Sequence, residues 1–207
     1  MSEPNNPDPR HDSFERDPAA DARTLLDAEE FCTAYEHWYA AVRETLLSEK
    51  YGPPPRGHDA GWALVGIKRR GALLARRLRE QLVEEGISPL FGEVDISLYR
   101  DDYHLQVSGP RVLGTEVPFA VDGVKILLID DVLYTGRTVR AAIDLILDFG
   151  RPRVIELGVF VDRGHRELPI QAHIIGQSIP TAHRDRVKVK LRELDGEDGV
   201  YLVGTEG

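Results

Sequence analysis

Cysteine is nearly absent from this chain, whose 207 residues contain only Cys32, so no intramolecular disulfide can form. Disulfide frameworks are typical of small secreted domains, whereas a chain of this length can bury a substantial core without them. The composition therefore favours a reducing compartment, and we expect a cytoplasmic protein.

Long apolar runs are absent as well. None approaches the roughly 20 residues that a bilayer-spanning helix needs, and the N-terminal MSEPNNPDPRHDSFERDP contains no apolar segment for export. We therefore expect no membrane partner. Basic residues are fewer than acidic ones, and the net charge of −9 disfavours indiscriminate binding to nucleic acid, although a local basic patch remains compatible with it.

The N-terminal part of the chain divides into two segments. Residues 1–22 are rich in Pro, Asp and Asn and poor in apolar residues, which predicts a disordered tail before a single domain over 23–207. Residues 24–50 have the pattern of a helix, with Asp27 and Glu30 at the spacing of a capping box. An aromatic and apolar stripe at helical spacing indicates a core or subunit contact more often than a platform for bases; its members are Phe31, Tyr35, Trp38, Tyr39 and Val42.

From residue 62 onward, apolar strands alternate with amphipathic helices. Strands are predicted at 62–67, 89–99, 124–129, 153–161 and near 201–204, and helices at 72–85 and 138–149. The buried face of the last helix is predicted to comprise Val139, Ala142, Ile143, Ile146 and Leu147. Residues 101–123 have no sustained period and predict a long, mobile loop. This order predicts an α/β fold with a mainly parallel, twisted sheet flanked by helices.

One short segment, ILLIDDVLYTGRT (126–138), has the composition of a ligand site. Asp130 and Asp131 follow an apolar strand, and ligands of open parallel sheets bind at the carboxyl ends of strands. Adjacent carboxylates accept hydrogen bonds from vicinal hydroxyls or help to hold a divalent cation. The following 135–138 opens a helix, whose backbone N–H groups and threonine hydroxyls suit an anion. Together they favour a ribose 5-phosphate over the alternative, a capped turn with two solvated aspartates.

ILLIDDVLYTGRT resembles the phosphoribosyl pyrophosphate (PRPP) signature of the type I phosphoribosyltransferases. Together with LVGIKRRGALLARRL, EVDISLYRDD and VFVDRGHRELPI, it resembles the PyrR family, the pyrimidine operon attenuators that are also uracil phosphoribosyltransferases. The similarity covers roughly residues 24–207. It implies the type I phosphoribosyltransferase fold with a small hood and a mobile loop, and a homo-oligomer, either a dimer or a larger assembly.

The resemblance also implies roles for individual residues. Asp130 and Asp131 would contact the ribose hydroxyls, and Arg100 would close over PRPP, so these three are the candidate catalytic residues. The rest of the PRPP site would be Val132, Leu133, Tyr134, Thr135, Gly136, Arg137 and Thr138, with the last four around the 5-phosphate. The pyrophosphate loop would be Lys68, Arg69, Arg70 and Gly71, for which a solvated basic turn is the alternative interpretation.

The implied reaction joins uracil N1 to C1 of PRPP and releases pyrophosphate, giving UMP. Mg²⁺ would be held mainly through PRPP, so no dedicated protein metal site is expected. Tyr134 stands where purine-specific relatives carry an Asp, which argues against hypoxanthine or guanine as the substrate. Asp162, Arg163 and Val187 would lie near uracil, whose polar groups backbone atoms can also recognise. No general base is assigned.

A second activity implied by the resemblance is binding of pyrimidine operon leader RNA. His165 and Arg166 match positions associated with RNA contact, with an exposed polar turn as the competing interpretation. The chain departs from the family's basic residues at Glu36, His37, Ala40, Gln171 and Gln177. Alternating cations at Lys188, Lys190 and Arg192 are more simply explained as a solvated strand face. We expect an intact enzyme with weakened, altered or absent RNA regulation; the alternative is an RNA-binding attenuation regulator with vestigial catalysis.

Overall fold

The structure is a computed structural model that describes residues 23–48, 50, 61–97 and 114–204. The tail predicted at 1–22 lies outside the described residues. So do Arg100 and most of the loop predicted at 101–123.

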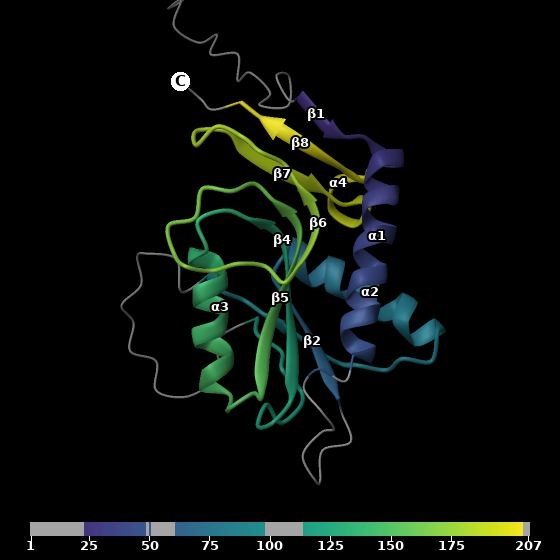
Figure 1. Cartoon of the computed structure of the whole chain (residues 1–207), viewed down its shortest axis with the longest axis vertical. Coiled ribbons are helices and arrows are strands. Elements are labelled where there is room, and N and C mark those ends of the chain that lie inside the picture. The colour runs from purple at the N-terminus through teal and green to yellow at the C-terminus, as the bar shows by residue number, and fades with distance from the viewer. Residues whose placement is uncertain (1–22, 49, 51–60, 98–113, 205–207) are drawn as a thin grey trace, which may run out of the picture.

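A five-stranded parallel sheet forms the centre of the molecule (Figure 1). Its order is β3-β2-β4-β5-β6, and every neighbouring pair is parallel. Its strands are β2 (Trp62–Ile67), β3 (Leu90–Val94), β4 (Lys125–Leu133), β5 (Val154–Asp162) and β6 (Ile174–Ser178). The predicted α/β class with a mainly parallel sheet is confirmed. Its strands are apolar along their length because both faces of the sheet are covered by helices.

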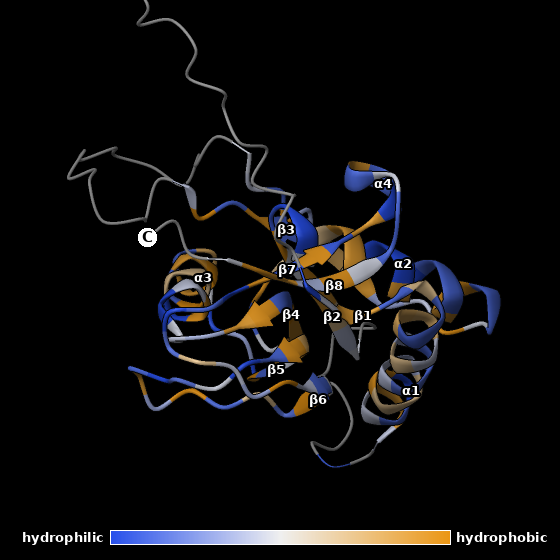
Figure 2. Cartoon of the chain, turned by 90° about the horizontal axis from the view of Figure 1, so that it is seen from above, coloured by the Kyte–Doolittle hydropathy of each residue, from blue (hydrophilic) through white to orange (hydrophobic). Residues whose placement is uncertain are grey.

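Three helices cover the two faces of this sheet (Figures 1 and 2). α1 (Ala28–Leu47) and α2 (Arg70–Glu84) lie on one face, and α3 (Arg137–Asp148) lies on the other. Each face accordingly has its own hydrophobic cluster, so the sheet separates two layers of core. Within the described residues, no helix is long and apolar enough to cross a membrane.

A small second sheet forms the hood, which lies beyond the carboxyl ends of the parallel strands (Figure 1). It contains β1 (Arg23–Leu26), β8 (Gly199–Val203) and β7 (Arg186–Lys190), in that antiparallel order, together with the short helix α4 (Arg192–Asp195). The helix predicted from residue 24 is therefore wrong at its start, because 23–26 pair with β8 from the other end of the chain.

The capping box at the start of α1 is confirmed. Asp27 Oδ1 accepts the backbone N–H groups of Glu29 and Glu30 at 3.0 and 2.9 Å, and Glu30 accepts the N–H of Asp27 at 3.0 Å. These bonds satisfy N–H groups that have no partner within the helix. They fix the helix start four residues later than the start predicted from residue 24.

The aromatic stripe of α1 belongs to the core. All five predicted residues are buried, and the rings of Phe31, Tyr35 and Trp38 pack around Phe160 of β5 at centroid distances of 4.6, 6.5 and 5.6 Å. The predicted face of α3 needs one correction. Leu147 is 50% exposed, and Leu145 is buried in its place, because position 145 lies beside 142 and 146 at 3.6 residues per turn.

Several predicted boundaries also differ from the observed ones. β3 ends at Val94, although Ile96 beyond it is still buried. Glu116, within the predicted loop, forms an antiparallel bridge with Glu93 through hydrogen bonds of 2.7 and 2.8 Å. Arg192 begins α4 and does not extend the strand that carries Lys188 and Lys190.

Candidate active site

The two aspartates lie where β4 extends past its neighbour β2. The last residue of β2 paired with β4 is Gly66, opposite Ile129, whereas β4 continues beside β5 as far as Leu133. The prediction that the strand ends before Asp130 is therefore wrong by four residues. Both aspartates belong to β4. Because β2 no longer pairs with β4 at these positions, that edge of β4 faces the turn that leads into α2.

The acidic pair is in an environment that disfavours charge. Asp130 is 5% exposed, and its Oδ1 accepts the N–H of Asp131 at 2.9 Å. Burial raises the pKa of Asp130 well above its usual value, and the neighbouring charge of Asp131 raises it further. Burial also raises the pKa of Asp131, against the opposing effects of a hydrogen bond with Asp130 and the positive charge of Arg70. Two neighbouring carboxyl groups of this kind can accept hydrogen bonds from hydroxyl groups or bind a cation.

Neutralising Asp130 is expected to stabilise the fold at neutral pH. The raised pKa means that its carboxyl stabilises the fold below the unfolded pKa, near 3.8, and that this stability is lost as pH rises through the folded pKa. Asp130→Asn, which retains an oxygen for the N–H of Asp131, should therefore raise the melting temperature at pH 7–8 by about 2–4 °C per kcal/mol gained. The gain should vanish near pH 3.5, as thermal denaturation at several pH values would show. A lower melting temperature of Asp130→Asn at pH 7–8 would contradict the claim that burial raises the pKa of Asp130.

An anion cradle follows the acidic pair. Gly136 caps α3 with φ of 92°, a left-handed conformation that strongly favours glycine. Thr135 Oγ1 accepts the N–H of Arg137 at 3.3 Å, and the Thr135 carbonyl accepts the N–H groups of Glu167 and Leu168. The turn is thus held from both sides, and the start of α3 presents backbone donors to an anion. The Arg137 side chain is directed to Glu167, with Nε donating at 2.7 Å.

The basic turn after β2 forms the other end of the site. Lys68 and Arg69 are joined by a cis peptide bond, and Arg69 is exposed. Lys68 Nζ donates a hydrogen bond to the Gly114 carbonyl and lies 3.4 Å from a carboxylate oxygen of Glu93. The Lys68 charge is therefore partly neutralised by a residue of the edge strand β3. Arg70 begins α2, two residues before the predicted start at residue 72.

Two connected hollows unite these parts. The first, of about 260 Å³, is lined by the basic turn and by both aspartates, and the second, of about 240 Å³, is lined by the anion cradle. They share Ile96, Asp130, Val132 and Thr138. Ile96 and Ser97 were not predicted as site residues, although their position after β3, at the same edge of the sheet, was a usable signal. The arrangement can hold a ligand with an anion at each end and hydroxyls between them.

The residues expected near uracil lie beside the cradle. Arg163 is 4% exposed and donates to Thr181 Oγ1 at 3.1 Å and to the Ala182 carbonyl at 2.9 Å, and its guanidinium lies 4.0 Å from the Tyr134 ring centroid. Asp162 pairs with Arg166 and accepts the N–H of Gly164 at 2.9 Å. Burial raises the pKa of Asp162, but these hydrogen bonds outweigh it and lower the pKa overall. Val187 is a half-buried residue of β7.

The residues considered for RNA contact are largely engaged within the protein. Arg166 donates to the carbonyls of Tyr134 and Ile170 at 2.9 and 3.1 Å and pairs with Asp162. His165 adopts φ of 62° and its Nε2 lies 2.7 Å from the Thr181 carbonyl. The cations of the second candidate surface are each paired: Lys188 with Asp195, Lys190 with Glu197 and Arg192 with Asp198. The positions where the chain departs from the family's basic residues are exposed, on α1, on the segment after β5 and on β6: Glu36, His37, Ala40, Gln171 and Gln177.

The donor set suits a divalent cation that brings its own ligands. Among the described residues, no group of three or more His, Cys, Asp or Glu side chains could hold a metal ion. Asp130 and Asp131 nevertheless offer carboxylate oxygens, the ligand type that Mg²⁺ prefers, and Mg²⁺ commonly combines one or two carboxylates with substrate phosphates.

Comparisons with known proteins agree with this geometry. The family model described as the phosphoribosyl transferase domain matches residues 22–189. The fold is similar to that of a hypoxanthine-guanine phosphoribosyltransferase from Leishmania tarentolae, with a TM-score of 0.63 and 16% identity over 89% of this chain and 97% of that one. A hypoxanthine phosphoribosyltransferase from Staphylococcus aureus gives a TM-score of 0.60 and 18% identity, over 89% and 93% of the two chains. These likenesses confirm the type I phosphoribosyltransferase fold.

Sequence relatives are considerably more similar than these structures. The Bifunctional protein PyrR of Listeria monocytogenes is 51% identical over 169 residues, which are 79% of this chain and 92% of that protein. The Bifunctional protein PyrR of Pelotomaculum thermopropionicum is 52% identical over 143 residues, 69% of this chain and 79% of that protein. Since half of the aligned residues are identical over most of the relatives' length, the chain belongs to the PyrR family of phosphoribosyltransferases.

Proposed function

We propose that this protein is a uracil phosphoribosyltransferase, which converts uracil and PRPP into UMP and pyrophosphate. The observation that carries the proposal is the arrangement, along two adjoining hollows, of a basic turn, the buried Asp130 with the half-buried Asp131, and an anion cradle. PRPP has the same order of groups: a pyrophosphate, a ribose with two free hydroxyls and a 5-phosphate. The membership of the chain in the PyrR family supports the same reading.

Each part of the cleft has a role in the proposed reaction. Asp130 and Asp131 accept hydrogen bonds from the ribose hydroxyls, and the backbone of 135–138 binds the 5-phosphate. As uracil N1 forms its bond to C1 and gives up its proton to solvent, the bond from C1 to pyrophosphate breaks, and the cations of 68–70 stabilise the charge on the leaving group. A transition state that resembles an oxocarbenium ion would depend on positioning and on leaving-group stabilisation. No general base is assigned. Arg100, outside the described residues, completes the proposed catalytic set.

Mg²⁺ is part of this proposal. Asp130 and Asp131 would hold it together with oxygens of PRPP, and its charge would offset part of the pyrophosphate charge. The described residues provide no separate cage, so the affinity for the cation should depend on PRPP.

Recognition of uracil is proposed to rely on backbone groups near Asp162, Arg163 and Val187. The polar atoms of Asp162 and Arg163 already have partners within the protein, so their side chains are poorly placed to recognise a base. Tyr134 takes the place of an acidic residue that would suit a purine ring. The protein is proposed to act in the cytoplasm as a homo-oligomer.

The proposal predicts UMP formation from uracil, PRPP and Mg²⁺. Chromatographic separation of nucleotides would measure it, with hypoxanthine, guanine and cytosine as comparison bases. We expect uracil to be preferred by at least about 100-fold, because a site that forms hydrogen bonds with one base leaves buried polar groups unpaired with another. Preference for a purine, or no nucleotide formation from any of these bases, would overturn the proposal.

Regulation through RNA is the second candidate function, favoured by the word "Bifunctional" in the names of the relatives. We propose that it is weakened or altered here, because Arg166 and the cations of β7 and α4 are paired internally. A titration of the protein's own operon leader RNA, with and without UMP, tests this. Weak binding should result, since affinity falls with each lost phosphate contact. Tight, UMP-dependent binding would restore a regulatory role.

A further inference from the structure

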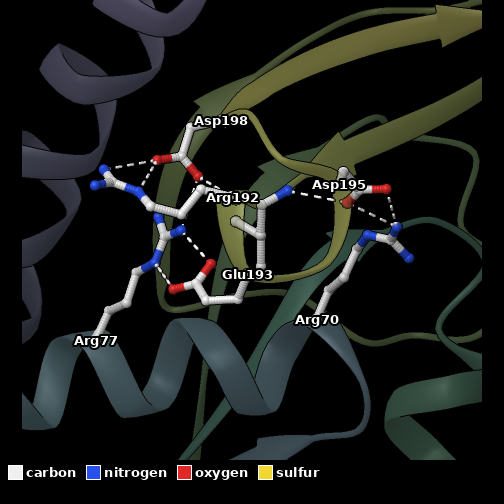
Figure 3. Close-up of polar contacts among 7 residues, drawn as sticks. Arg70, Arg77, Arg192, Glu193, Asp195 and Asp198 are labelled. Atoms are coloured by element: carbon white, nitrogen blue, oxygen red, sulfur yellow. Dashed lines mark hydrogen bonds and ion pairs between the residues drawn. The ribbon is translucent and has the colours of Figure 1, made fainter.

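The hood is joined to α2 by a network of ion pairs between residues far apart in sequence. Figure 3 shows Arg70 and Arg77 extending from α2 toward acidic residues of α4 and of the turn after it. Arg77 bonds to Glu193 and Asp198 at 2.7 Å each, near the middle of the helix. Arg70, at the first position of the helix, forms hydrogen bonds and an ion pair with Asp195 and with no other described residue. The Arg77 pairs thus anchor the hood to α2, whereas the Arg70 pair links the hood to the proposed pyrophosphate site.

Asp195 holds Arg70 by one amino group only. Arg70 Nη2 donates to both oxygens of Asp195 at 3.0 Å, whereas the Arg70 Nε–H is buried without an acceptor among the described residues. Asp195 also pairs with Lys188 at 3.2 Å and accepts the N–H of Leu191 at 3.1 Å. Burial raises the pKa of Asp195, but these contacts outweigh it and lower the pKa overall, so the carboxylate is charged at neutral pH.

A second carboxylate, that of Asp131, lies within reach of the charge of Arg70. Arg70 lines the same hollow as Asp130 and Asp131, and its charge lowers the pKa of Asp131 against the effect of burial. Arg and carboxylate groups form strong charge-assisted pairs whenever they meet. An Arg70 released from Asp195 would therefore turn to Asp131 and occupy the oxygens that the ribose hydroxyls need.

We propose that Asp195 is a positioning residue for phosphoribosyl transfer: it holds Arg70 beside the pyrophosphate end of the cleft and away from Asp131. The inference rests on the proposed function. Asp195 touches neither substrate nor reacting atoms, and it acts through Arg70. The hood thereby takes part in PRPP binding through a contact across 125 positions of sequence.

The test compares Asp195→Asn with Asp198→Asn in steady-state kinetics. Asn at 195 keeps an oxygen for the N–H of Leu191 but loses the charge that holds Arg70. We expect the KM for PRPP to rise about tenfold, as for loss of a charge-assisted contact, with the KM for uracil unchanged. The inhibition constant of UMP, which has the same ribose hydroxyls, should rise in parallel with the KM for PRPP.

Asp198 provides a matched control. Its side chain is similarly buried, at 9% exposed against 12% for Asp195, and it joins the hood to α2 through Arg77 without touching Arg70. Asp198→Asn should lower the melting temperature yet leave the KM for PRPP within about twofold of wild type, because it is not coupled to Arg70. If Asp195→Asn does not fold, Asp195→Glu and Asp195→Gln carry the comparison, since they match in length and differ in charge; only Gln should raise the KM.

The possible outcomes distinguish a failure of the proposed role of Asp195 from a failure of the proposed phosphoribosyltransferase function. A wild-type protein that forms no UMP would overturn the proposed function, and the role of Asp195 with it. An active wild type whose Asp195→Asn variant matches Asp198→Asn in PRPP and UMP binding would overturn the role of Asp195 alone. A lower KM for PRPP in Asp195→Asn would show that Asp195 withholds Arg70 from the substrate, which also contradicts the proposal.

Discussion

Asp131→Ala should lower the kcat/KM for UMP synthesis by about 100- to 1,000-fold, the range for losing one contact that positions or stabilises the reacting group. At neutral pH the variant should melt at or slightly above the wild-type temperature, because burial raises the pKa of Asp131 and its charge therefore does not favour the folded state. Steady-state kinetics with varied PRPP, together with thermal denaturation, would measure both quantities.

Asp144→Ala is the matched control for this experiment. Asp144 lies on the exposed side of α3, with 55% of its side chain accessible, and within the described part of the chain its one ion pair is with Arg140 of the same helix at 3.5 Å. Exposed pairs at this spacing contribute about 0.3–0.5 kcal/mol, so both its activity and its melting temperature should match the wild type. Near-normal UMP synthesis by Asp131→Ala would show that the acidic pair does not bind the ribose.

Gly71→Ala should impair both the fold and the reaction, although it adds a single methyl group. A Cβ at Gly71 would lie 2.6 Å from the Ile129 carbonyl oxygen and 3.0 Å from Asp130 Cα, and both are backbone atoms of β4. The start of α2 must therefore move away from the aspartates. Overpacking of this kind costs about 1–3 kcal/mol, which corresponds to about 2–4 °C of melting temperature per kcal/mol. The KM for PRPP should rise together with this loss, as kinetics and denaturation on the same preparation would show.

Gly61→Ala separates the effect of close packing from the general effect of replacing glycine. A Cβ at Gly61 would meet no atom of the described residues within 4 Å. Its melting temperature and KM for PRPP should equal those of the wild type or improve slightly, because alanine restricts the unfolded chain. If Gly71→Ala behaved like Gly61→Ala, α2 would not lie as close to β4 as the structure indicates.

The parts of the site that are contiguous in sequence could be predicted from the sequence. Asp130 and Asp131, followed directly by the 135–138 turn, combine two kinds of ligand group within nine residues. The hydrophobic period alone was enough to predict the parallel sheet and the buried stripe of α1. Such patterns are informative because strand and helix geometry repeat over a few residues, so neighbouring side chains report on a common face.

Other details could not be predicted because packing and pairing in the folded chain decide them. Residues 23–26 have a helix-like composition but form β1, because β8 offers an edge for pairing. The RNA contact of Arg166 stays a prediction, but the structure shows that the Asp162 carboxylate and four backbone carbonyls engage this side chain. Leu147 fitted a buried period at the end of α3 but is half exposed.

The sequence by itself determined the α/β class, the acidic pair and the anion cradle, since each depends on residues that are neighbours along the chain. Only the tertiary structure decided that β4 extends past β2 beside Gly71, that the hood contains both ends of the domain, and that Asp195 reaches Arg70. These features depend on which surfaces of separate elements pack together. Packing is governed by the shape and charge of the whole molecule and leaves no short pattern in the sequence.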